Sequence, residues 1–153
     1  MAHLAPTDTH MSLPIKLQEI VDDFASMTRE EKLETLIGYS ETLPPLPARF
    51  KEERANMEEV PECMTPVCLF AEKQDDGGIA FHFDIPPQSP TVRGLTSILA
   101  NGLNGAKLEE IVSVPADFFL PMKLDEAVSQ QRIHGFMGVL AHMKQAAVKL
   151  GTE

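Results

Sequence analysis

The chain has 153 residues, of which 43% are hydrophobic and 24% are charged. This length and composition favour one globular domain, and no apolar run reaches the roughly 18 residues that a membrane-spanning helix needs. The formal net charge is −10, from 13 basic and 23 acidic residues. It argues against nucleic acid or a membrane as the main partner, because both attract basic surfaces.

The first residues carry no periodic pattern. Residues 1–12 are polar and contain Pro6, so we expect them to be disordered and the domain to span 13–153. They have neither a basic stretch nor an apolar core typical of a signal peptide. With two cysteines and no export signal, the sequence predicts a cytoplasmic protein.

Two helices are predicted next. Residues 13–27 repeat apolar side chains at helical spacing. Thr28 and Glu31 then form a capping box, in which each side chain satisfies the other's free backbone N–H, so a second helix begins there. Its expected apolar face is Leu33, Leu36 and Ile37, and the prolines of 43–47 end it. The charged stretch 48–59 predicts either a short helix or a loop.

A β-hairpin follows. Residues 67–73 and 79–85 have strand composition, and the intervening QDDGG is turn chemistry. Apolar residues alternate with His82 and Asp84 along the second strand, which predicts one apolar face. The segment just before Cys63 is a candidate third strand.

Helices close the chain. Ser89 and Pro90 are suited to begin a helix that Gly105 ends. Short helical pieces are expected near 107–113 and 115–122, and a long helix over about 129–149, capped by Ser129. Its expected apolar side is Ile133, Phe136, Met137, Leu140 and Ala147. The order predicts an α+β fold, a small antiparallel sheet flanked by helices.

The two cysteines, Cys63 and Cys68, lie in the segment VPECMTPVCLF. Zinc sites usually combine two closely spaced ligand pairs, so C-x4-C with His82 as a third ligand is a weak signal. A disulfide needs Cα atoms within about 7 Å, which a strand beginning near Cys68 disfavours. The strand favours a core position for Cys68.

Cys63 is a different case, because prolines stand on both sides of it and favour a defined loop. A cysteine in such a loop is either incidental or a thiol that another protein can reach. The residues around it leave both alternatives open. The pattern also places the histidines: His82 is predicted on the open face of a strand, and His134 and His142 lie off the apolar stripe and are predicted at the surface.

Four segments follow one another along the chain: LPPLP, VPECMTPVCLF, TVRGLTSILANGLNGAKLEEIVS and QQRIHGFMGVLAHMKQAA. This succession resembles the SufE family of sulfur acceptors for iron–sulfur cluster assembly, over roughly residues 15–148. The resemblance implies a SufE/IscU-like fold. Cys63 matches the family's sulfur-accepting cysteine, and Arg132 matches an arginine near the start of its last helix.

The chain departs from the family pattern at three places. Glu62 replaces the usual glycine before the cysteine, Cys68 stands where tryptophan is usual, and Gln88 lies near the usual aspartate. The carboxylate of Glu62 should disfavour the thiolate of Cys63. Glu62, Met64 and Arg132 are the candidate partner-binding residues, and Arg132 is equally compatible with a structural ion pair.

What the resemblance implies is sulfur relay. A SufS-like, pyridoxal-phosphate-dependent cysteine desulfurase would pass its persulfide sulfur to Cys63, and the sulfur would go on to a SufBCD-like scaffold. The protein would act as an accessory sulfur-transfer protein rather than an independent enzyme, with no cofactor of its own, as a monomer or weak homodimer. Two alternatives remain at this point: a docking or regulatory module that carries no sulfur, and a metal-binding protein using Cys63, Cys68 and His82.

Overall fold

The computed structural model describes residues 13–50 and 57–151. The expected disorder of 1–12 and the helix or loop over 51–56 therefore lie outside the described residues. The elements are α2 (Ile15–Ala25), α3 (Arg29–Thr42), β1 (Glu58–Glu59), β2 (Cys68–Lys73), β3 (Ile79–Asp84), α4 (Pro90–Leu103), α5 (Leu108–Val112), η2 (Leu120–Met122), η3 (Leu124–Glu126) and α6 (Gln130–Gly151). Within these ranges no helix is both long and apolar enough to cross a membrane. The fold is α+β, as predicted.

The sheet has three antiparallel strands in the order β1-β2-β3, so the candidate third strand is confirmed, with only two residues. In the hairpin, Leu69 pairs with Phe83 and Ala71 pairs with Phe81, which places these side chains on one face. The turn between β2 and β3 contains Gly77 at φ +88°, a left-handed conformation that suits glycine. Strand β3 thus has the predicted apolar face, on which Ile79, Phe81 and Phe83 are buried.

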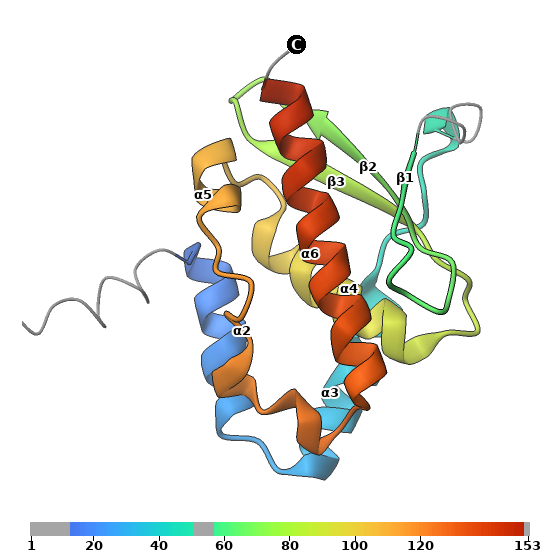
Figure 1. Ribbon diagram of the computed structural model, residues 1–153, viewed down its shortest axis with the longest axis vertical. Coiled ribbons are helices and arrows are strands. Elements are labelled where there is room, and N and C mark those ends of the chain that lie inside the picture. The colour runs from blue at the N-terminus through green and yellow to red at the C-terminus, as the bar shows by residue number, and fades with distance from the viewer. Residues whose placement is uncertain (1–12, 51–56, 152–153) are drawn as a thin grey trace, which may run out of the picture.

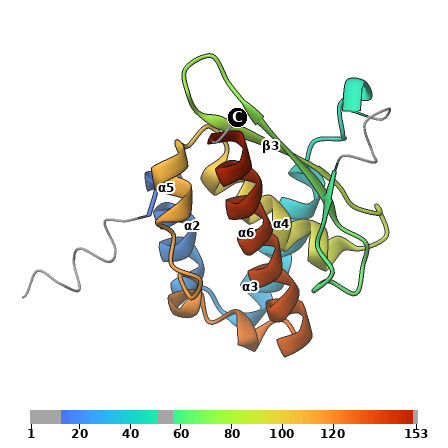
Figure 2. The ribbon, with the colours of Figure 1, turned by 45° about the horizontal axis from the view of Figure 1, so that its top comes forward.

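Helix α6 runs through the middle of the molecule and contacts both β2 and α4 (Figure 1). Helix α4, almost wholly buried, packs in turn against α2 and α3. Seen from a second direction, the sheet still lies at one end and α2 and α5 on the far side of α6 (Figure 2). The connection between β1 and β2 therefore emerges beside α6, close to where α4 begins.

Helix α3 begins with the predicted capping box, because Glu31 N–H donates to Thr28 Oγ1 and Thr28 N–H donates to Glu31 Oε1. Its predicted apolar face is wrong in part. Leu36 is buried, but Ile37 is 54% exposed and the buried row continues through Lys32 and Ser40. The reason is that the Lys32 ammonium finds polar partners inside the fold.

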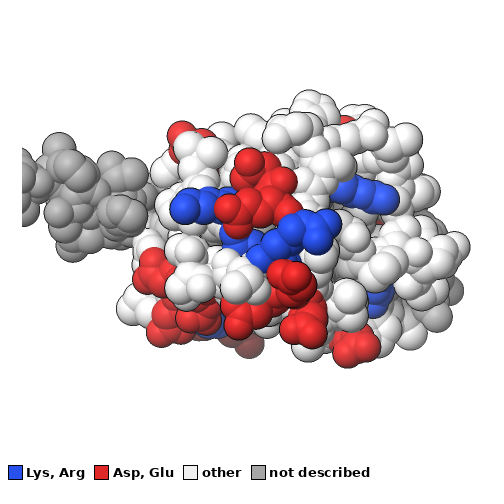
Figure 3. Space-filling model, turned by 90° about the horizontal axis from the view of Figure 1, so that it is seen from below, with Lys and Arg blue, Asp and Glu red and all other residues white. Residues whose placement is uncertain are grey.

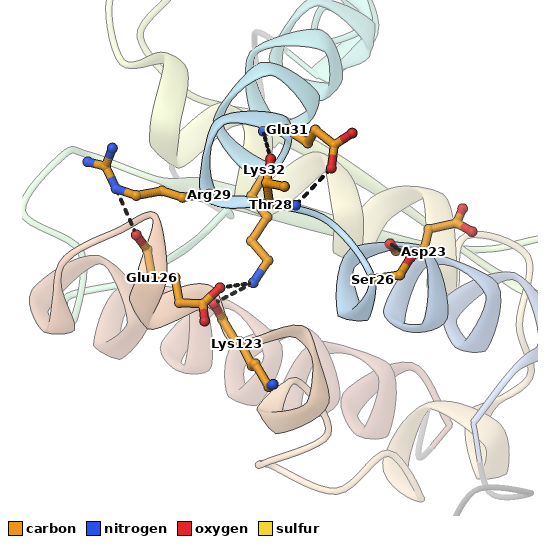
Figure 4. A network of polar contacts seen from close by, with 8 residues as sticks. All are labelled: Asp23, Ser26, Thr28, Arg29, Glu31, Lys32, Lys123 and Glu126. Carbon is orange, nitrogen blue, oxygen red and sulfur yellow. Dashed lines mark hydrogen bonds and ion pairs between the residues drawn. The ribbon is translucent and has the colours of Figure 1, made fainter.

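Those partners come from the segment before α6 (Figure 4). Lys32 Nζ donates to the carbonyl oxygen of Lys123 at 3.1 Å and lies 2.5 Å from Glu126 Oε1. Arg29 Nε donates to the Glu126 carbonyl oxygen at 3.0 Å. We call Lys32 and Glu126 the Lys32 brace, because they join α3 to η3 across more than ninety positions of sequence.

Two further local predictions need correction. Ser89 stands at the N-cap of α4, but its side chain makes no capping bond and donates to Thr65 Oγ1 at 3.4 Å instead. Met137 is 38% exposed rather than part of the buried side of α6. Ser129 does cap α6, since its Oγ accepts from the Arg132 N–H at 3.3 Å.

The net charge of −10 is not spread evenly over the surface. Seen from below, the molecule carries basic side chains that are bordered on both sides by acidic ones (Figure 3). Opposite charges that alternate in this way limit the long-range field of the face. The charge total alone therefore does not identify a docking face here.

Candidate functional site

The Cys63 loop, which we define as residues 60–67, is a closed turn between β1 and β2. Its base is fastened by the Val60 N–H, which donates to the Val67 carbonyl oxygen at 3.0 Å. Its first turn is fastened by the Cys63 N–H, which donates to the Val60 carbonyl oxygen at 3.2 Å. Pro61 takes the second position of that four-residue turn, where proline is favoured. The defined loop predicted from the flanking prolines is therefore confirmed.

The loop rests on two glycines of α6, one helical turn apart. A Cβ added at Gly135 would lie 2.9 Å from Cys63 Sγ, and one added at Gly138 would lie 2.7 Å from Glu62 Cβ. A Cβ at Gly138 would therefore displace the Glu62 side chain, and one at Gly135 would displace the Cys63 sulfur, because real Cβ atoms essentially never approach other atoms so closely. The Cys63 thiol also donates to the Gly135 carbonyl oxygen at 3.5 Å. We call Gly135 and Gly138 the glycine seat.

A small apolar cavity lies beside the Cys63 thiol, enclosed by the loop, α4 and α6. Its free space is about 20 Å³, roughly what one water-sized group requires. The residues around it are mostly apolar: Cys63, Met64, Val92, Leu95, Thr96, Gln131, Arg132, Gly135, Phe136 and Val139. The thiol of the free protein therefore faces a nearly filled hydrophobic pocket.

Three influences set the charge state of Cys63. Burial raises the pKa of the Cys63 thiol most, the carboxylate of Glu62 raises that pKa further, and the Arg132 guanidinium lowers it. The expectation that Glu62 disfavours the thiolate is thus matched by the direction of this shift. In the closed loop the sulfur is held chiefly as the thiol, a weak nucleophile.

The other candidate residues surround Cys63 in different ways. Met64 is 75% exposed and forms the outer rim of the cavity, while Arg132 lines it from the first turn of α6. Glu62 turns toward α6, where His142 Nε2 lies 3.2 Å from Glu62 Oε1. The structure therefore brings Glu62, Cys63, Met64 and Arg132 together at one place.

Cys68 and His82 lie elsewhere. Cys68 is half-buried and pairs with Asp84 on the face of the sheet opposite to Leu69, so its predicted core position is wrong. His82 is half-buried too, with Nε2 3.2 Å from Glu72 Oε1. No disulfide joins the two cysteines. In the part of the chain that the structure describes, no group of three or more histidine, cysteine or acidic residues is placed to hold a metal ion.

Comparison with known proteins decides the family. The family model described as "SufE: Fe-S metabolism associated domain" matches residues 18–147, which include the loop, the seat and the cavity. The chain belongs to the SufE family. An association of this SufE protein with iron–sulfur metabolism follows from that membership.

Relatives and a solved structure agree with this assignment. An uncharacterised SufE-like protein of Mycobacterium tuberculosis is 38% identical over 134 residues, covering 88% of this chain and 92% of that protein. SufE-like protein 1 of Arabidopsis thaliana, chloroplastic/mitochondrial, is 31% identical over 139 residues but is matched over only 36% of its length. The solution structure of a hypothetical protein from Thermus thermophilus superposes with a TM-score of 0.81 at 28% identity, covering 92% of this chain and 99% of that one.

Sequence reasoning missed three residues that shape this SufE site: Gly135, Gly138 and His142. They are spaced i, i+3 and i+7, so they share one face of α6. That spacing was visible in the sequence as two small residues followed by a histidine. The prediction of His142 as a surface residue is wrong, because only 15% of its side chain is exposed.

Proposed function

We propose that this SufE protein accepts sulfur on Cys63 from the persulfide of a cysteine desulfurase and passes it to an iron–sulfur cluster scaffold. The observation that carries the proposal is the placement of the Cys63 thiol. A short, fastened loop presents it beside a cavity with room for about one more group. Family membership supports the metabolic setting.

The transfer step is an exchange between a thiolate and a persulfide. The Cys63 thiolate attacks the outer sulfur of the donor persulfide, so a new S–S bond forms at Cys63 and the donor's S–S bond breaks. The donor cysteine leaves as a thiolate, and no external oxidant or reductant is needed. Such exchange depends on thiolate fraction and access.

The resting geometry opposes this reaction in the free protein. Burial and the Glu62 carboxylate raise the pKa of Cys63, and the glycine seat holds its sulfur against α6. A docked desulfurase would therefore have to draw the loop outward. Met64, which is 75% exposed beside Cys63, is the apolar side chain of the loop that such a partner can contact.

The cavity suits the product of the step as well as the resting thiol. A persulfide adds one sulfur to Cys63, and the apolar lining would keep water, oxidants and stray thiols from it. Among the described residues that line the cavity, Arg132 is the one with a basic side chain, and it lowers the pKa of Cys63. We assign to Arg132 the stabilisation of sulfur anions during transfer.

The experiment is intact-protein mass spectrometry after incubation with a SufS-like cysteine desulfurase and L-cysteine. Wild type should gain one or more sulfur atoms, and reductant should remove them. Cys63→Ser should show no gain, whereas Cys68→Ser, the matched control on the outer face of the sheet, should gain sulfur like wild type.

The same samples distinguish the alternative of a docking module. Desulfurase turnover is measured in parallel as sulfide or alanine release. If wild type gains no sulfur but still raises turnover, and Cys63→Ser raises it equally, the sulfur-carrier function is wrong and a docking activator is left.

A further inference from the structure

His142 lies on α6 opposite the Cys63 loop, in a position that neither the cavity nor the transfer step explains. Its side chain is 15% exposed, and its two ring nitrogens each face a carboxylate oxygen. Nδ1 lies 2.5 Å from Glu58 Oε2, and Nε2 lies 3.2 Å from Glu62 Oε1. One imidazole thus joins α6 to both β1 and the residue that precedes Cys63.

The charge state of the imidazole decides how many of these contacts hold. A neutral imidazole carries one N–H and can donate to only one of the two carboxylates, whereas the imidazolium ion donates to both. The charged groups packed here come from three places: Glu58 on β1, Glu62 on the loop and Lys149 on α6, whose Nζ lies 3.4 Å from Glu58 Oε1. The complete set of contacts therefore requires protonated His142.

The contact reaches Cys63 through one peptide bond. Glu62 and Cys63 sit on Gly138 and Gly135, so the two residues must leave the glycine seat together. Holding the Glu62 carboxylate on α6 therefore also holds the Cys63 sulfur in its pocket.

We propose that His142 is a positioning residue that clamps the Cys63 loop shut through Glu62, and that loss of its proton loosens the loop. The clamp thus makes access to Cys63 dependent on pH, apart from the titration of the thiol itself. Its consequence for sulfur acceptance rests on the proposed function, but the clamp itself does not.

The test measures alkylation of Cys63 by iodoacetamide, which needs no partner and no sulfur donor. All variants carry Cys68→Ser, so that only one thiol reacts. The pKa of the Cys63 thiol is measured for each variant by ultraviolet absorbance at higher pH, and each rate is divided by the thiolate fraction that this pKa gives. The quotient then reports how often the loop exposes Cys63.

His142→Gln should raise this quotient about fivefold near pH 6 and by a smaller factor near pH 8.5, because a neutral imidazole can donate to only one of the two carboxylates. His134→Gln, which alters an exposed histidine of the same helix, is the matched control and should match wild type at both pH values. A folded His142→Gln variant with the wild-type quotient at both pH values would overturn the proposal.

Glu62→Gln provides a second test if His142→Gln does not fold. It removes the charge on the loop side and should likewise raise the quotient near pH 6 and flatten its pH dependence. A pH dependence equal to that of wild type would contradict the clamp. Because persulfide formation is scored by mass in a separate experiment, failure of sulfur transfer with a working clamp, or the reverse, is recognisable.

Discussion

Two charged contacts hold distant segments of this chain together, and they differ in permanence. The Lys32 brace joins α3 to η3 at one end of the fold, with Lys32 only 1% exposed. The His142 clamp joins α6 to the Cys63 loop. A lysine ammonium has three N–H donors, whereas an imidazole donates to two carboxylates only when both ring nitrogens carry a proton. The scaffold contact thus has donors to spare, and the contact that holds the moving segment depends on a single proton.

The two contacts also respond to pH in opposite directions. Lys32 lowers the pKa of Glu126, so the brace contributes stability above the ordinary carboxyl range and loses it as pH falls. The clamp is complete only when both ring nitrogens of His142 carry a proton. Acid should therefore weaken the scaffold contact, whereas loss of a proton from His142 should release the loop.

The largest expected effect comes from removing the brace. Lys32→Ala leaves the Lys123 carbonyl oxygen without its donor and opens space in the core, and should lower the free energy of unfolding by about 2–3 kcal/mol in urea titrations. Lys16→Ala, at an exposed position of α2, is the control and should stay within about 0.5 kcal/mol. Equal stabilities of the two variants would mean that the brace contributes nothing.

The same variants test whether the two regions act separately. Lys32→Ala should leave the thiolate-corrected alkylation rate of Cys63 unchanged at urea concentrations where the protein is folded. A large rise in that rate would show that the brace and the loop belong to one cooperative unit, and the comparison between them would then fail.

The next effect concerns the glycine seat. Gly135→Ala places a Cβ 2.9 Å from Cys63 Sγ, so the sulfur should be displaced from its pocket and Cys63 should be alkylated roughly tenfold faster. Gly38→Ala is the control, because a Cβ at this position of α3 meets nothing within 4 Å. It should leave alkylation unchanged and stabilise the helix by up to about 1 kcal/mol. Unchanged alkylation in Gly135→Ala would show that the seat does not position the thiol.

Local patterns in the sequence predicted most of the fold. Periodicity located the helices, turn residues located the β2–β3 hairpin, and the capping box marked the start of α3. Prolines around Cys63 predicted its defined loop, although only the family resemblance singled out this cysteine over Cys68. Each of these signals acts over a few neighbouring residues, which a single sequence displays.

The two charged contacts could not be predicted in this way. Lys32 and His142 are polar residues on amphipathic helices, and a local pattern assigns such residues to solvent. Lys32 is buried because it contacts Lys123 and Glu126, which are more than ninety positions away in the sequence. His142 is held by Glu58 and Glu62, which are 84 and 80 positions away in the sequence. The partners become visible only when the chain is folded.

The smallest expected effect comes from a third charged contact, on the outer face of the sheet. Glu72 accepts two hydrogen bonds from Arg49, at 2.6 and 2.9 Å, and its Oε1 lies 3.2 Å from His82 Nε2. Chiefly through the hydrogen bonds from Arg49, the pKa of Glu72 falls from the ordinary 4.5 to about 2. The pair has a permanent cation, like the brace, but its side chains are 57% and 35% exposed.

Exposure should reduce what this contact contributes. Glu72→Gln should lower the free energy of unfolding by only about 1 kcal/mol near neutral pH, because solvent screens the pair. A lowered pKa stabilises the fold above the unfolded-state value, so the difference from wild type should shrink as pH falls from about 4.5 toward 2. Glu19→Gln, at an exposed position of α2, is the control for loss of one carboxylate. If Glu72→Gln lowered the free energy of unfolding as much as Lys32→Ala, burial would not explain why the Lys32 brace is stronger than the Arg49–Glu72 contact. The basic residue of each contact would then determine its strength, whether the contact is buried or exposed.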